Sequence, residues 1–173
     1  MERDFFMRTQ RMGFSRWRRE DLPLATLLWG DPAVTRLICA SGVFSPEDVA
    51  ARLALEVSNG EHHGIQYWPV FDLETGGFVG CCGLRPRAPG VFELGAHLCP
   101  TWWGEGRAEE AASAVLDYAF RTLGAEKIFV GHHPDNGASR RLVEKLGFCS
   151  LGTEYYPPTG LYHPSYELEN PNR

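Results

Sequence analysis

The stretch Trp103-Gly104-Glu105-Gly106-Arg107-Ala108 separates an apolar segment that ends near Cys99 from a segment with helical periodicity. Two glycines one residue apart at a strand-to-helix junction let the backbone turn its N–H groups toward a ligand. The helix that follows adds the positive end of its dipole, so the junction suits a phosphate group. The stretch therefore predicts a site for a phosphorylated cofactor.

Two familiar phosphate-binding motifs do not fit this stretch. A P-loop requires Gly-x4-Gly-Lys-Ser/Thr, and neither Lys-Ser nor Lys-Thr follows these glycines. A dinucleotide fingerprint requires a third glycine at position 109, where this chain has glutamate, and it lies early in a βαβ unit. A nucleotide-binding module is therefore the least favoured function for the stretch.

The length and composition of the chain are those of a globular protein. Its 173 residues fit one domain, 1–173, and its hydrophobic and charged fractions, 43% and 23%, exclude a disordered chain or a coiled coil. The net charge of −5 argues against a nucleic-acid partner and slightly favours a basic acceptor. No run approaches the ~20 apolar residues of a membrane span, and the N-terminus lacks a signal-peptide core. We therefore expect no membrane partner and a cytoplasmic location.

The cysteines point to the same compartment. Five are present, an odd number, and none forms a Cys-x-x-Cys pair. Cys81 and Cys82 are adjacent in an apolar segment. This pattern indicates reduced, mostly buried thiols rather than a disulfide framework or a metal site.

The hydrophobic pattern predicts an α/β (α+β) protein with a mixed sheet rather than a doubly wound one. Ser45-Pro46 begins a helix that Asn59-Gly60 ends, and Arg85–Gly90 reads as a turn. Gly95, inside a strand, indicates a bulge or a close backbone approach. The expected order is a strand at 13–17, helices at 20–29 and 46–58, strands at 65–72, 78–84 and 92–98, a helix at 108–123, a strand at 127–130, a helix at 137–146, and a closing strand pair at 148–149 and 161–168.

A second block, downstream of the glycine stretch, reads Asn136-x-x-Ser139-x-x-Leu142-x-x-Lys145-x-Gly147-Phe148. With both blocks, the chain resembles the acetyl-CoA-dependent N-acetyltransferase (GNAT) superfamily, and within it the branch of the ribosomal-protein N-terminal acetyltransferases. The pyrophosphate loop of that family reads Arg/Gln-x-x-Gly-x-Gly/Ala, and Trp103 stands in place of its Arg or Gln. Thr9-Gln10-Arg11-Met12 and Gly30-Asp31-Pro32 extend the resemblance over nearly the whole chain.

The resemblance implies a GNAT-like fold with a mixed, mostly antiparallel, twisted sheet of about seven strands and about four helices. It also implies a V-shaped splay between the fourth and fifth strands, 92–98 and 127–130, which admits the pantetheine arm of acetyl-CoA. Glu105 is expected to face solvent, and Arg107 either compensates for the uncharged Trp103 or only covers the helix. The residues implied for coenzyme A, with no metal, are His97, Leu98, Cys99, Trp103, Gly104, Glu105, Gly106, Arg107, Ala108, Asn136 and Ser139.

Acetyl transfer to an amine requires a neutral nucleophile, a polarised carbonyl group and a proton for the departing thiolate. Glu93 is the candidate base, since it lies mid-strand beside the splay, and its alternative is a solvated or salt-bridged residue. Ser139 either protonates the sulfur and holds pantetheine, or only bonds its own helix. Asn136 either caps that helix or also binds pantetheine, and Tyr155 is a candidate acid or a core residue.

These residues favour an N-acetyltransferase that uses acetyl-CoA, with a non-catalytic acyl-CoA-binding or regulatory module as the alternative. The acceptor is an amine, either a peptide N-terminus or a small molecule. The resemblance does not settle this choice, because acceptor pockets are built from the variable segments, here 33–64 and 154–163. The oligomeric state stays open, with a homodimer as one option.

Overall fold

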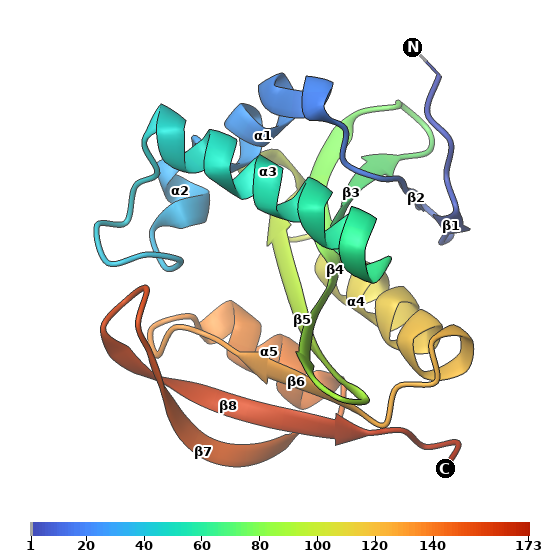
Figure 1. Ribbon diagram of the computed structural model, residues 1–173, viewed down its shortest axis with the longest axis vertical. Helices are drawn as coiled ribbons and strands as arrows, with labels where there is room; N and C mark the ends of the chain where they lie inside the picture. The colour runs from blue at the N-terminus through green and yellow to red at the C-terminus, as the bar shows by residue number, and fades with distance from the viewer. Residues whose placement is uncertain (1) are drawn as a thin grey trace.

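Residues 2–173 are described by the computed structural model (Figure 1). Within them, no helix is long and apolar enough to cross a bilayer. The helices are α1 Leu22–Trp29, α2 Pro32–Thr35, α3 Pro46–His63, α4 Arg107–Asp117 and α5 Gly137–Lys145, with 3-10 turns at Arg19–Asp21 and Pro100–Trp102 and a π-helical turn at Tyr118–Thr122. The strands are β1 Met7–Arg8, β2 Met12–Phe14, β3 Tyr67–Asp72, β4 Phe78–Ala88, β5 Val91–Leu98, β6 Lys127–Gly131, β7 Cys149–Tyr156 and β8 Leu161–Glu169.

The strands form one mixed sheet in the order β1-β2-β3-β4-β5-β6-β8-β7. Every neighbouring pair is antiparallel except β5 and β6, which run parallel. The predicted mixed, mostly antiparallel sheet is therefore confirmed. It has eight strands in the part of the chain described, because the two-residue β1 pairs with β2 at one edge.

Helices cover both faces of the sheet, with α3 in front and α4 behind in Figure 1. Because side chains alternate along a strand, Cys81 packs with α1 and α3, whereas its neighbour Cys82 packs with α4. Two hydrophobic cores result, one on each face. All five cysteines are free, and three of them, Cys81, Cys82 and Cys99, are buried.

The parallel strands β5 and β6 pair over only part of their length. Their register runs from Val91 opposite Lys127 to Glu93 opposite Phe129 and then stops. Beyond Glu93, β5 continues to Leu98 along β4, while β6 continues along β8 to Gly131. The two strands therefore diverge at Glu93, and the predicted splay is confirmed.

Several predicted boundaries are wrong. The strand expected at 13–17 is β2, which ends at Phe14, and the strand expected at 148–149 is β7, which continues to Tyr156. The helix expected to end at Asn59-Gly60 continues to His63 and ends at Gly64, whose φ is +71°. Gly60 lies inside this helix. Only glycine fits at this position without a shift, because a Cβ there would lie 2.5 Å from the side-chain nitrogen of Gln66. The turn expected at Arg85–Gly90 is shorter, since β4 continues to Ala88 and pairs Pro86 with Phe92.

Gly95 makes the close approach that the sequence indicated, and the partner is a side chain. The register of β4 with β5 is regular at this position. A Cβ on Gly95 would lie 2.3 Å from Cζ of Tyr67 and 2.6 Å from its hydroxyl oxygen. Tyr67 itself is only 5% exposed. Glycine at this position is therefore what lets the phenol ring lie flat against β5.

Replacing Gly95 by alanine is expected to displace Tyr67 and to lower the free energy of unfolding by about 2 kcal/mol, because the added methyl overpacks a buried ring. Gly131→Ala is the matched strand control, since its Cβ would meet Phe129 at an ordinary 3.5 Å. Urea unfolding of both variants measures the difference. Equal losses for the two variants would show that Tyr67 yields without cost.

Candidate active site

A cavity of about 680 Å³ follows the divergence of β5 and β6. Its wall includes all three candidate catalytic residues, Glu93, Ser139 and Tyr155. Of the residues predicted to bind coenzyme A, the wall contains His97, Leu98, Trp103, Gly104, Gly106, Arg107, Ala108, Asn136 and Ser139. The topology thus brings to one cavity residues that are far apart in the sequence.

The glycine stretch, of which Gly104, Gly106, Arg107 and Ala108 line this cavity, has a row of unused backbone donors. The N–H groups from Gly104 to Ala108 have no hydrogen-bond acceptor within residues 2–173. Gly104 and Gly106 have φ values of +83° and +76°, which favour glycine and turn successive N–H groups to one side. Five such donors at the start of α4 make a site for an anion with two phosphate groups.

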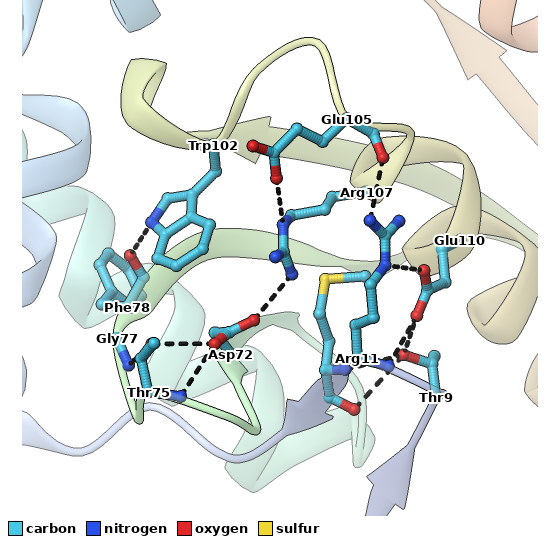
Figure 2. A network of polar contacts seen from close by, with 11 residues as sticks. Thr9, Arg11, Asp72, Thr75, Gly77, Phe78, Trp102, Glu105, Arg107 and Glu110 are labelled. Atoms are coloured by element: carbon cyan, nitrogen blue, oxygen red, sulfur yellow. Dashed lines mark hydrogen bonds and ion pairs between the residues drawn. The ribbon is translucent and has the colours of Figure 1, made fainter.

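The side chain of Arg107 points away from this donor row and into the protein (Figure 2). Its Nη1 donates to Oδ1 of Asp72 at 2.9 Å, its Nε lies 3.2 Å from the carboxylate of Glu105, and its guanidinium lies over the ring of Trp102. The side chains of Arg107 and Asp72 are 10% and 5% exposed. The side chain thus holds the loop onto β3, and a phosphate would meet the backbone N–H of this residue.

Several bonds keep Asp72 ionised in this network. Burial, the largest influence on its pKa, favours the neutral acid. The hydroxyl and N–H groups of Thr75 and the guanidinium of Arg107 outweigh burial and lower the pKa of Asp72. The carboxylate is therefore charged at neutral pH.

A second ion pair ties the loop to the start of the chain. Arg11 donates through Nε to Glu110 at 2.7 Å and through Nη1 to the carbonyl of Glu105 at 3.0 Å, and Thr9 donates to Glu110 at 2.6 Å (Figure 2). Arg11 and Arg107 therefore hold the loop from both sides. In the sequence, Arg11 is only part of the motif Thr9-Gln10-Arg11-Met12, which predicts no role for its side chain.

Three of the predicted cofactor-binding residues, Cys99, Glu105 and Trp103, differ from the others in position or in hydrogen bonding. Cys99 lies off the cavity wall, is buried, and donates its N–H to Val79. Glu105 also lies off the wall, with a side chain that is 57% exposed, as expected. Trp103 lines the cavity and donates its indole N–H to the carbonyl of Leu98 at 2.8 Å, which joins the loop to the end of β5.

Asn136 and Ser139 lie together on the opposite wall, at the start of α5. The side-chain oxygen of Asn136 accepts the N–H of Ser139 at 3.0 Å, so Asn136 caps the helix. Its amide nitrogen and the Ser139 hydroxyl have no partner among the residues described. Capping and ligand binding are thus compatible for Asn136, and the Ser139 hydroxyl does not bond its own helix.

Glu93 lies at the point where β5 and β6 part. It is half-buried and forms no ion pair within residues 2–173, so the salt-bridge alternative has no support. Burial raises the pKa of its carboxyl, and this effect outweighs the nearby Arg87 and Arg85, which act to lower it. A raised pKa makes the ionised carboxylate a stronger base.

Tyr67 was not recognised from the sequence as a site residue, yet it lines the cavity beside Gly95. Burial, the largest influence, and Glu93 raise the pKa of its phenol far above the usual value. The hydroxyl is therefore a permanent donor. In the sequence, only Gly95 indicated that another group approaches β5 closely, and it did not identify Tyr67 as that group.

His97, on the same wall, is neutral and has a defined tautomer. Trp29 donates its indole N–H to Nδ1 of His97 at 3.1 Å, so the imidazole carries its proton on Nε2. Burial, followed by the charges of Arg52 and Arg85, lowers the pKa of His97 well below its usual value. Tyr67 and His97 thus both offer donors, and Glu93 is an acceptor on the same strand as His97, with Tyr67 packed on Gly95 between the two.

Tyr155 lines the cavity from β7 but is 53% exposed and packs at an angle of 59° against the ring of Tyr162. The alternative of a core residue therefore does not hold. No group of three or more His, Cys, Asp or Glu side chains within the described residues is arranged to hold a metal ion.

Comparison with known proteins places these features in a family. Residues 11–149 match the model of the acetyltransferase (GNAT) domain. The Bacillus subtilis (strain 168) protein YkkB is 33% identical over 132 residues, which cover 75% of this chain and 76% of that protein. A GNAT-family acetyltransferase structure from Bacillus anthracis has a TM-score of 0.80 at 22% identity and covers 95% of this chain and 98% of its own. A structure of the ribosomal L7/L12 α-N-protein acetyltransferase RimL in complex with coenzyme A has a TM-score of 0.79 at 15% identity and covers 96% and 98%.

Asp72→Ala is expected to lower the free energy of unfolding by about 3 kcal/mol at neutral pH, because it leaves the buried guanidinium of Arg107 with only the exposed carboxylate of Glu105 as an ion-pair partner. Asp117→Ala, which removes the exposed partner of Arg121, is the control and should cost less than about 0.5 kcal/mol. Because the pKa of Asp72 is lowered, its contribution is lost only as the pH falls through that lowered pKa. Denaturant unfolding at pH 7 and at pH 3 measures both effects, and similar losses for the two variants would contradict the role of the pair.

Proposed function

The chain belongs to the GNAT acetyltransferase family and is an N-acetyltransferase, and from this premise we propose that it transfers an acetyl group from acetyl-CoA to a primary amine. One observation carries the proposal. The donor row from Gly104 to Ala108 and the half-buried carboxylate of Glu93 belong to the same cavity, the first suited to bind a pyrophosphate and the second suited to act as a base. The amine attacks the thioester directly, without an enzyme-bound intermediate.

The donor end fits coenzyme A through its backbone. Five free N–H groups meet the pyrophosphate without a lysine, and Asn136 and Ser139 offer an amide nitrogen and a hydroxyl along the path of the pantetheine arm. Where β5 and β6 part, both strands have edge groups that a pantetheine amide can pair with. Acetyl-CoA supplies the activated acyl group when it is bound there.

Glu93 acts as the base for the acceptor. As the amine nitrogen forms its bond to the carbonyl carbon, the nitrogen loses a proton to the carboxylate, directly or through a water molecule. The C–S bond breaks, and sulfur leaves as a thiolate. The ammonium form, which predominates in water, gives its first proton to solvent before it reacts, and Glu93 takes the second proton as the neutral amine attacks.

The departing thiolate takes a proton from Ser139 or Tyr155. Ser139 offers a hydroxyl that has no acceptor within the described residues, and Tyr155 offers a phenol that is half in solvent and exchanges its proton freely. Tyr67, whose raised pKa makes it a poor acid, is a hydrogen-bond donor to the reacting oxygen or to the acceptor instead. Ser139→Ala and Tyr155→Phe distinguish the two proton sources.

The test of this function is release of free coenzyme A from acetyl-CoA in the presence of single primary amines and of peptides with a free N-terminus. Turnover with at least one amine is expected. Tight coenzyme A binding without turnover on any amine would favour the acyl-CoA-binding module instead. Gly106→Ala tests the donor row, since alanine at a φ of +76° disturbs the N–H groups and should weaken coenzyme A binding about tenfold in calorimetry. Gly124→Ala is the matched control, because its φ is +66° but it lies off the cavity wall.

Glu93→Gln is expected to lower kcat by about 100-fold or more, because glutamine cannot accept the proton. In the wild type, kcat should fall as the pH decreases through the raised pKa of Glu93, since the protonated acid is inactive. That acidic limb should be missing in the variant. Glu169→Gln, an exposed position on β8, is the control. A Glu93→Gln variant that keeps the activity and the acidic limb would exclude Glu93 as the base.

A further inference from the structure

The wall of the cavity on the α1 and α3 side, here called the acceptor wall, contains four arginines. Arg36 follows α2, Arg52 lies on α3, and Arg85 and Arg87 lie on β4. Glu93 and Glu154 are the acids on this wall. The excess of cations is local, since the chain as a whole has a net charge of −5.

Neighbouring groups do not cancel this excess. Glu154 pairs with Arg87 at 2.7 Å, and the buried Glu56 pairs with Arg52 and Arg85. With Glu93 ionised, the wall and Glu56 together keep one positive charge in excess, and two once Glu93 has taken a proton. Arg36 has no carboxylate within ion-pair distance among residues 2–173. His97 and His163 do not add to the charge, because burial lowers the pKa of both.

Arg52 and Arg85 are held as a pair. Both bond the same oxygen of Glu56, Oε1, through Nε of Arg52 at 3.1 Å and Nη2 of Arg85 at 2.7 Å. The second oxygen of Glu56 accepts the N–H of Tyr67 at 2.8 Å, and the carboxylate is fully buried. The two guanidinium groups therefore meet at one point, directly behind Tyr67.

Aromatic rings fix the planes of the same two groups. Arg85 lies 4.4 Å from the ring centre of Tyr67, and Arg52 lies 5.0 Å from that of Trp29 and 5.4 Å from that of Tyr67. Both Nη groups of Arg52 and Nη1 of Arg85 have no acceptor in the part of the chain described, although both residues line the cavity. Two immobilised guanidinium groups with unused donors match the geometry of a carboxylate.

We propose that the acceptor is a free amino acid, whose carboxylate binds Arg52 and Arg85 while its amino group faces Glu93. This inference rests on the proposed acetyl transfer and names its acceptor class. The carboxylate neutralises the excess charge of the acceptor wall, and in an α-amino acid it lies next to the amine, as Arg52 and Arg85 lie near Glu93 and His97. A protein N-terminus lacks this charge, because its α-carboxyl group is part of a peptide bond. A purely cationic amine would add to the excess.

The test compares free L-amino acids with their carboxamides, which keep the amine and the shape but lose the charge. In the coenzyme A release assay, kcat/KM of the wild type should favour the acid of the best pair by roughly 10- to 100-fold. Arg52→Gln should reduce this preference to less than about threefold, because kcat/KM for the acid falls much more than kcat/KM for the amide. Calorimetric titration of the same pair into the protein with coenzyme A present should show the same loss for the acid.

Arg140→Gln is the matched control, because Arg140 pairs with a glutamate four residues later, as Arg52 does, but lies outside this cavity. A general loss of structure in Arg52→Gln would lower turnover of acid and amide alike, and the wild-type comparison stands without any variant. Equal kcat/KM for acids and amides, or a preference for peptides that begin with Asp or Glu, would overturn the inference and leave acetyl transfer intact. Absence of turnover with every amine would contradict the proposed function itself.

Discussion

The parting of β5 from β6 is the constraint on which the rest of the structure depends. The two strands share only three residue pairs, because β5 stays with β4 on one side and β6 stays with β8 on the other. Backbone groups that a continuous sheet would pair are thereby left beside a cavity. The parting also places Glu93, the last residue of β5 that pairs with β6, at the point where the two strands diverge. The proposed donor site, the proposed base and the acceptor wall all take their positions from this one break in the sheet.

At the donor end, charged side chains serve the scaffold and the backbone is left for the ligand. Arg107 forms an ion pair with Asp72, and Arg11 forms one with Glu110. These pairs attach the loop to β3 and to the start of the chain. The donor row between them needs no side chain, so Trp103 can stand where a polar residue is otherwise found. Rigidity supplied by ion pairs behind the loop keeps the N–H groups oriented before the ligand arrives, which lowers the ordering cost of binding.

The sequence predicted the elements whose signals are local. Caps at Ser45 and Asn136, glycines at Gly104 and Gly106, and the apolar run around Cys81 and Cys82 are each signals of the structure in their own neighbourhood. Where the local structure depends on contact with a side chain from another element, the prediction failed or stayed incomplete. A glycine after Asn59 predicts a helix end, because nothing in the sequence shows that Gly60 is needed to make room for the side chain of Gln66. Tyr67 and Glu56 were missed for the same reason, since an aromatic residue in a strand and a glutamate on a helix are ordinary until the sheet brings them to one cavity.

The acceptor wall also bears on the chemistry of Glu93. Arg87 and Arg85, with a smaller effect from Arg52, act to lower the pKa of this carboxyl, against the larger opposing effect of burial. A carboxylate bound to Arg52 and Arg85 would offset part of their charge and remove water from the same volume. Both changes raise the pKa of Glu93 and make its ionised form a stronger base. In the proposed mechanism, the carboxylate that positions the amine thus also strengthens the base that deprotonates it, so that an acceptor without a carboxylate loses in the rate of attack as well as in binding.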